Sequence, residues 1–262
     1  MGVALKKPPV YLTVVQVRFN PILKLAEFLP AVQEGMRRTG FPAYQAQTAI
    51  ALQLTVQGGH PAPVPFVRER SSFGNVDKTH EFWLDSDSLA LQSTNYGNFE
   101  SFSEVFLNGL ALVHDAVHLD FTERIGLRYL DRVFPLGDDT LAQYLVPQAL
   151  GLSAALGGSA QHSYLEAVCK VDAYLLRSRV VVQSGGLAFP PDMVPGGLVV
   201  SKRLAEYDGL NAILDNDGSL ETREIYSANG VAKHLDAIHK IIGNAFRAIA
   251  TDHARKVWDQ EQ

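Results

Sequence analysis

The chain has 262 residues, of which 47% are hydrophobic and 19% are charged. That share of apolar side chains can offset the entropy lost when the backbone is ordered, so the composition excludes an intrinsically disordered protein. The 28 Asp and Glu residues outnumber the 23 Lys and Arg residues, and the net charge of −5 argues against nucleic acid as a partner.

Several features of the sequence predict a cytoplasmic protein without a membrane partner. The first residues, MGVALKKPPVYL, lack the apolar run and cleavage site of a secretory signal. No unbroken apolar stretch approaches the roughly 20 residues that a membrane-spanning helix needs. The single cysteine, Cys169, permits no internal disulfide and suits a reducing compartment.

The first 120 residues combine strand and helix patterns in a regular order. Apolar residues alternate with polar ones up to Phe19, which predicts a strand with one buried face. The spacing then becomes helical, and Pro30 fits the first turn of a helix that ends before Gly40. Further strands lead to a second helix, which Asn98 can cap. The expected strands cover residues 10–19, 44–57, 66–84 (with a turn) and 88–95, and a Gly/Pro-rich loop covers residues 58–65.

The second half of the chain restarts this order. A strand pattern precedes a short helix, and three strand-like segments then lead to a long helix that Ser227 caps. We expect this last helix to continue to Trp258, a length of roughly 48 Å. The expected strands cover residues 122–134, 161–183 (with a turn near Ala173), 198–207 and 210–216, and the short helix covers residues 140–150.

The repeated order of elements predicts an α+β fold. Two similar strand-helix-strands-helix halves, residues 8–120 and 121–262, would form one or two antiparallel sheets with helices packed on one face. Consecutive strands are too seldom separated by helices for a doubly wound parallel sheet. We expect residues 1–262 to form a single structural unit.

Four segments of the chain resemble a sporadically distributed prokaryotic protein family whose members have no characterised function. The most specific is RIGLRY followed by Asp or Asn and Arg, and the next is Phe-x4-Thr-Asp in the closing helix. The resemblance implies a whole-chain unit from a bacterium, no standard enzyme class, and a setting in defence or mobile genes. The four segments are Pro8–Phe19, Trp83–Phe102, Arg124–Val133 and Leu235–Trp258.

The sequence contains no phosphate-binding loop, dinucleotide fingerprint or hydrolase elbow. His114 and His118 lie four residues apart on a predicted helix and could present two imidazoles to one metal ion. However, a zincin motif has Glu directly after its first histidine, whereas this chain has Asp115. We interpret both histidines as structural and expect no cofactor or metal; a metal-assisted enzyme that uses this cluster is the alternative hypothesis.

Two further candidate sites have structural interpretations. Cys169 alternates with apolar residues, so we expect it in the core rather than as a nucleophile. The segment Asp215–Gly218 resembles the start of a calcium loop, but Ser219 and Tyr226 occupy positions that require carboxylates. We expect a strand end and a turn there.

Arginine side chains on one strand are the most informative feature of the sequence. Alternation places Arg124, Arg128 and Arg132 on one face, with Arg18 at a comparable position on the first strand and Tyr164 on a neighbouring one. The face is either a lattice of ion pairs or a recognition surface for carboxylate or phosphate. We predict a non-catalytic protein that binds a protein partner or an anionic ligand there; enzyme activity and homo-oligomerisation stay open.

Overall fold

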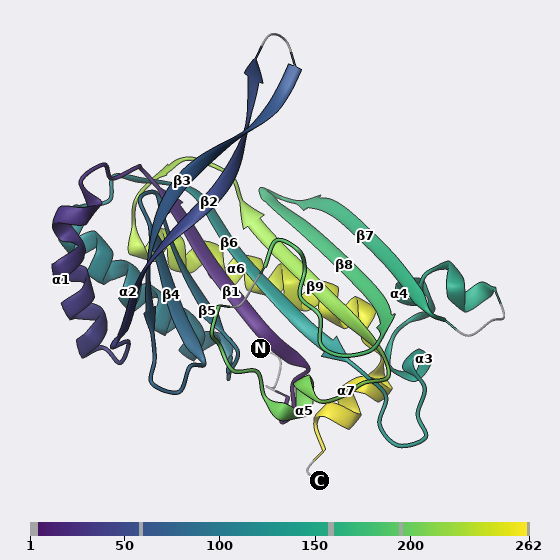
Figure 1. Ribbon diagram of the computed structural model, residues 1–262. Coiled ribbons are helices and arrows are strands. Elements are labelled where there is room, and N and C mark those ends of the chain that lie inside the picture. The colour runs from purple at the N-terminus through teal and green to yellow at the C-terminus, as the bar shows by residue number, and fades with distance from the viewer. Residues whose placement is uncertain (1–4, 58–59, 157–159, 194–195, 261–262) are drawn as a thin grey trace.

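The computed structural model describes residues 5–57, 60–156, 160–193 and 196–260. In this part of the chain, ten strands form one antiparallel sheet (Figure 1). Its order is β2-β3-β4-β5-β1-β6-β9-β8-β7, and β10 pairs with β6 outside this path. The strands are β1 (Val10–Phe19), β2 (Ala43–Gln57), β3 (His60–Gly74), β4 (His80–Asp85), β5 (Ser88–Ser93), β6 (Phe121–Val133), β7 (His162–Val171), β8 (Tyr174–Ser184), β9 (Leu210–Leu220) and β10 (Glu224–Ile225).

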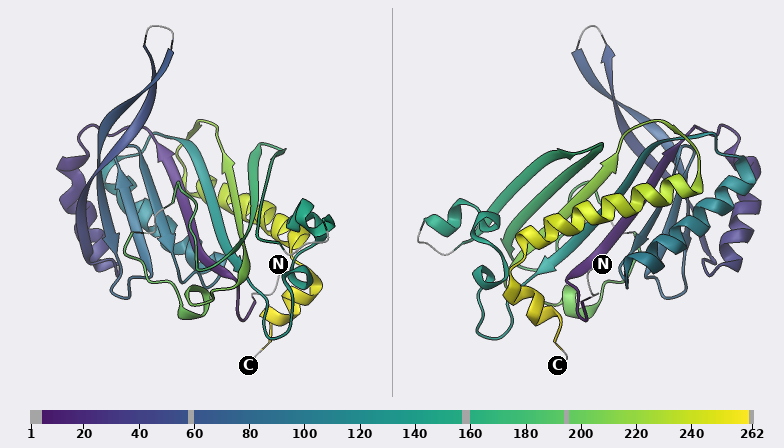
Figure 2. Two further views of the ribbon diagram at one scale, coloured as in Figure 1. Left: turned by 45° about the vertical axis from the view of Figure 1, so that its right-hand side comes forward. Right: turned by 180° about the vertical axis from the view of Figure 1, so that it is seen from behind.

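Three long helices cover one face of the sheet, as the view from behind shows (Figure 2). They are α1 (Leu25–Arg38), α2 (Phe99–Val117) and α6 (Ala228–Ile249). The predicted α+β class, with an antiparallel sheet and helices packed on one face, is therefore confirmed. The shorter helical elements are α3 (Leu141–Tyr144), α4 (Pro147–Leu150), a 3-10 turn (Leu152–Ala155), α5 (Lys202–Ala205) and α7 (Asp252–Trp258).

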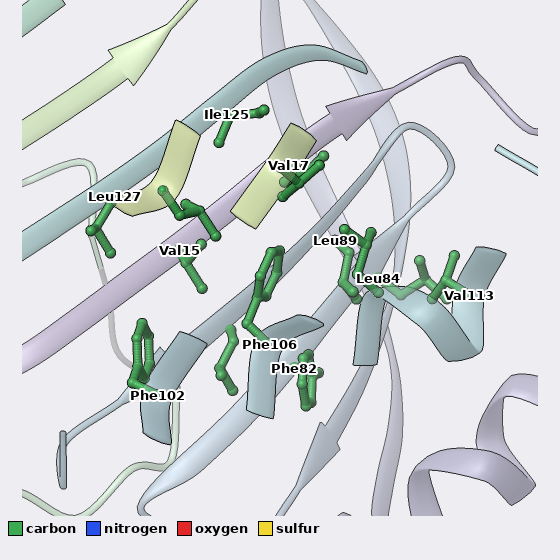
Figure 3. Packing of buried hydrophobic residues seen from close by; sticks show 14 of the residues in the cluster. Val15, Val17, Phe82, Leu84, Leu89, Phe102, Phe106, Val113, Ile125 and Leu127 are labelled. Carbon is green, nitrogen blue, oxygen red and sulfur yellow. The ribbon is translucent and has the colours of Figure 1, made fainter. Parts of the chain in front are cut away.

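The main core lies between the sheet and the long helices (Figure 3). Phe102, Phe106 and Val113 are spaced along α2 so that they share one face, and all three are buried against the strands. The alternating residues Val15 and Val17 of β1 meet them from the sheet. Gly109 brings α2 close, because a Cβ at this position would lie 2.5 Å from the ring of Phe82.

A second segment covers part of the opposite face. Residues 185–193 and 196–207, here called the covering segment, include α5 and contact β1, β6 and β9. Leu204 from this segment is buried with Tyr11, Leu130 and Ile213 in a separate apolar cluster. In the described ranges, the long helices therefore cover one face of the central strands, and the opposite face is open except beneath the covering segment.

Local signals set the starts of α2 and α6, whereas the start predicted near Pro30 is wrong, because α1 begins at Leu25 and contains Pro30 in its interior. The side chain of Asn98 accepts a hydrogen bond from the amide of Ser101, and Ser227 accepts one from Gly230. The prediction of one helix from Ser227 to Trp258 is wrong, because Ala250 adopts an extended conformation and bridges to Leu145. The hydroxyl of Thr251 then caps the separate helix α7.

Two other predicted segments differ in the structure. The expected loop at residues 58–65 is wrong from His60 onward, since β3 begins there and pairs with β2 along a long hairpin. Its alternating prolines are tolerated because β4 pairs with β3 only from Ser71 to Gly74, so this part of β3 has a free side. The strand predicted at residues 198–207 is also wrong: the segment contains α5.

The two predicted halves share a topological relation. β1 lies beside β5, the last strand before α2, and β6 lies beside β9, the last long strand before α6. β1 and β6 pair with each other at the centre of the sheet. The division at residues 8–120 and 121–262 stays a prediction. None of the helices in the described ranges is long and apolar enough to cross a membrane.

Helix α6 depends on close packing against β9, which gives a test of the core. Ile238 is fully buried, and a Cβ on Gly218 would lie 2.6 Å from its Cγ2. We expect Ile238→Ala to lower the free energy of unfolding by about 2–5 kcal/mol, because the cavity cannot be filled by neighbouring side chains. Urea unfolding measures this, and a loss below about 0.5 kcal/mol would contradict the packing.

Candidate functional site

The arginines of β6 have different surroundings, although alternation places them on one face. Arg132 is 1% exposed. Its guanidinium donates to the carbonyl oxygens of Leu204 at 2.6 Å, Gly185 at 2.8 Å and Tyr207 at 2.9 Å, and to the side chain of Asn211 at 3.2 Å. Arg132 therefore attaches the covering segment to the sheet, and its donors are used inside the protein.

Arg128 belongs to a network of ion pairs centred on the buried carboxylate of Asp215. It donates to both carboxylate oxygens of Asp215, at 2.6 and 2.8 Å, and to Asp192 of the covering segment at 2.7 Å. Arg179 on β8 donates to the same Asp215 at 2.9 Å and to Glu166 on β7 at 2.6 Å. These hydrogen bonds hold the pKa of Asp192 and of Glu166 below their usual values. The network connects β6, β9, β8 and β7 across the open face.

Tyr164 lies at the outer end of this network. Its side chain is 57% exposed, and its hydroxyl donates to Glu166 at 3.1 Å. β7 is the last strand of the sheet, so Tyr164 projects from an edge that carries further exposed apolar residues, Leu165 and Val168 among them.

Arg18 and Arg124 form a separate pair on the open face. They are register partners across β1 and β6, and the side chain of Arg18 is 47% exposed. Arg124 lies over Gly126, and its nearest carboxylates, Asp217 and Glu221, are each 3.6 Å away. The nearest acidic group to Arg18 is Asp87, at 4.0 Å. Both guanidinium groups thus have looser partners than Arg128 or Arg132.

The histidines of α2 have structural contacts. The Nδ1 atom of His114 accepts a hydrogen bond from the amide of Leu119 at 3.0 Å, and its ring stacks on Tyr226. His118 is the C-cap of α2 and has a positive φ of 53°. In the described ranges, no three His, Cys, Asp or Glu side chains are grouped so that they could hold a metal ion. His114, Asp115 and His118 therefore do not form a ligand set there.

Two predictions about single segments are wrong. Cys169 is exposed rather than buried, because β7 is an edge strand with both faces in solvent. Asp215–Gly218 is not a strand end, since β9 continues through it to Leu220. The reason is pairing: β6 and β8 flank this stretch on both sides and extend the ladder.

A cavity of about 730 Å³ lies on the opposite side of the sheet, among α2, α6 and the chain before β1. Asp131 of β6 lines it and is only 6% exposed. Within the described part of the chain, no hydrogen-bond donor or cation contacts its carboxylate; burial alone raises its pKa from 3.8 to about 7. The apolar part of the lining comes from Leu5, Pro8, Pro9, Phe99, Ile242 and Phe246.

A hydrogen-bonded chain of aromatic side chains lies beside Asp131 in this cavity. The hydroxyls of Tyr96 and Tyr129 are 2.9 Å apart, and Tyr129 is 3.0 Å from Nδ1 of His239. The His239 ring stacks on Phe99 with centroids 4.1 Å apart. Burial raises the pKa of both tyrosines and lowers that of His239. All three groups are therefore neutral near pH 7.

Sequence reasoning missed Asp131, although a signal was present. Asp131 follows Ile125, Leu127 and Tyr129 at a spacing of two, so alternation places a carboxylate on the buried face of the strand. A charged residue at a core position is rare unless it is paired or has a function. The sequence signal at His239 is weaker, because a histidine on an amphipathic helix does not by itself indicate a site.

No protein-family model, curated protein or solved structure matches this chain. The interpretation of the two candidate regions therefore depends on their geometry alone.

Arg128 gives a test of the ion-pair network. Arg128→Ala leaves Asp215, which is 2% exposed, with Arg179 as its remaining cation. We expect the free energy of unfolding to fall by about 1–3 kcal/mol, because a buried carboxylate loses two charge-assisted hydrogen bonds. Denaturant unfolding measures this. Arg38→Ala, at an exposed ion pair on α1, is the control and should change stability by about 0.5 kcal/mol or less; equal effects would contradict the network.

The burial of Asp131 can be tested by the pH dependence of the free energy of unfolding. Its pKa is raised in the folded protein, so the unfolded chain ionises first, and wild-type stability should fall as pH rises from about 4 to about 7. Asp131→Asn removes this loss. We expect the variant to gain on the order of 3–4 kcal/mol relative to wild type between pH 4 and pH 8.

Unfolding by guanidinium chloride across this range measures the gain. The neighbouring Tyr96, Tyr129 and His239 are present in both proteins, so their titration cancels to first order in the comparison. A difference between the two proteins that does not change with pH would show that Asp131 is solvated.

Proposed function

We propose that the protein is a non-catalytic binding protein that holds an anionic group, on a ligand or on a partner protein, at the open face of its sheet. The observation that carries this proposal is the pairing of Arg18 with Arg124. Like charges directly opposite each other on neighbouring strands are destabilising unless an anion lies between them.

The surroundings of this pair support binding from outside. Guanidinium groups present several donors in a planar fork that suits carboxylate and phosphate. Arg124 makes contacts of 3.4 Å to Gln16 and 3.6 Å to two carboxylates, which leaves its donors poorly satisfied. An incoming anion would therefore meet incompletely neutralised charge.

Arg128, Arg132 and Tyr164 have supporting roles in this proposal. Arg132 attaches the covering segment to the sheet, and the network of Arg128 links β6 to β9, β8 and β7 beside the site. Tyr164 is the exposed group at the far end of the network, where a larger partner would extend toward β7. A site held by rigid strands loses little conformational entropy when it binds.

Isothermal titration of the full chain with tripolyphosphate and with hexaglutamate tests the proposal. We expect at least one of these probes to bind the wild type, and Arg18→Ala and Arg124→Ala each to weaken it at least about tenfold. Melting temperatures should change little, since both side chains have loose partners. Arg38→Ala on α1 is the matched control and should bind like wild type. Absence of binding to both probes, or equal binding by all variants, would reject the arginine site.

A further inference from the structure

The cavity behind the sheet holds a carboxylate that has no counter-ion within the described ranges of the chain. Asp131 is 6% exposed, and among the described residues nothing donates to it. The nearby hydroxyls of Tyr96 and Tyr129 do not serve it, because they bond to each other and to His239. A buried carboxylate in this state costs stability, so its retention requires an explanation outside folding.

We propose that this cavity binds a small organic ammonium ion whose nitrogen donates to the carboxylate of Asp131. The volume of about 730 Å³ falls within the usual range for small-ligand sites. An ammonium group brings both charge and hydrogen-bond donors, which are the two things that Asp131 lacks. The site is on the opposite face of β6 from Arg124, so this proposal does not depend on the anion site.

The lining of the cavity favours an apolar body on the ligand. Phe99, Phe246 and the two prolines before β1 provide apolar and aromatic surface, and aromatic faces attract cations. His239 is neutral because burial lowers its pKa, so it does not repel a cation near the carboxylate. A monovalent aryl-alkyl amine fits these walls better than a metal ion, since no other carboxylates among the described residues group with Asp131 to complete an oxygen shell.

Three cations also line the cavity, but each has a partner of its own. Lys240 donates to Asp236 at 2.6 Å, Arg247 to Asn244 at 2.7 Å, and Arg255 to the carbonyl of Ala250 at 3.1 Å. They belong to α6 and to α7, whereas Asp131 belongs to the sheet. These three cations could instead attract an anionic ligand, which is the main alternative to an ammonium ion. Phenylacetate, an anion with the same aromatic body as phenethylamine, distinguishes the two.

Titration of the full chain at pH 8 with phenethylamine, 2-phenylethanol and phenylacetate tests the proposal. The three probes share a body and differ in charge. We expect phenethylamine to bind wild type at least tenfold more tightly than either of the others. Asp131→Asn should remove this preference, with at least a tenfold loss for the amine and little change for the alcohol. Preference for phenylacetate, or amine binding that survives Asp131→Asn, would overturn the proposal, as would absence of amine binding.

A second variant tests the cavity independently, in case Asp131→Asn does not fold. Gly243 lines the cavity from α6, and a Cβ there meets only the end of the Arg247 side chain, at 3.4 Å. Gly243→Leu should fill the cavity, strengthen the helix and abolish amine binding while Asp131 stays in place. Asp115→Asn removes an exposed carboxylate from α2 and should bind the amine like wild type. Amine binding by Gly243→Leu at wild-type affinity would place the ligand outside the cavity and reject the assignment.

Discussion

The antiparallel pairing of β1 with β6 is the constraint on which the rest of the structure depends. These two strands join the two halves of the sheet, and each hydrogen bonds on its other side to the last long strand of its own half. Their register sets which side chains meet across the centre. A shift of one residue would exchange the buried and open faces of β6, which would put Arg128 in the core and Leu127 in solvent.

That register also explains why one strand serves two different environments. Along β6, Arg128 and Arg132 alternate with Tyr129 and Asp131, so successive residues project to opposite faces. On the open face Arg128 meets carboxylates from β9 and from the covering segment, and Arg132 meets carbonyl oxygens of that segment. On the helix face Asp131 meets a cavity among α2, α6 and the chain before β1. The row of arginines and the cavity that holds Asp131 are thereby separated by the thickness of a single sheet.

The sequence predicted those features that depend on local chemistry. Asn98 and Ser227 cap their helices because a short polar side chain can reach an amide three residues ahead. The α+β class followed from changes in apolar spacing. The break at Ala250 could not be predicted in this way, because the bridge to Leu145, more than 100 residues earlier, stabilises it. Cys169 was misplaced for a related reason: alternation shows that a strand has two faces, but whether either is covered depends on its place in the sheet.

The roles of the arginines on the open face could not be predicted from the sequence either. Period-two spacing correctly grouped Arg124, Arg128 and Arg132, yet their roles are set by partners distant in sequence. Arg132 meets carbonyls of the covering segment, and Arg128 meets Asp215, whereas Arg124 meets Arg18. Donors that are already satisfied gain little from an added ligand, because each new hydrogen bond replaces an existing one. The proposed binding function therefore rests on the members of the row that are least well paired. Applied to the other face, the same reasoning selects Asp131, whose carboxylate is buried and has no partner in the described part of the chain, over the half-exposed and paired carboxylate of Asp236.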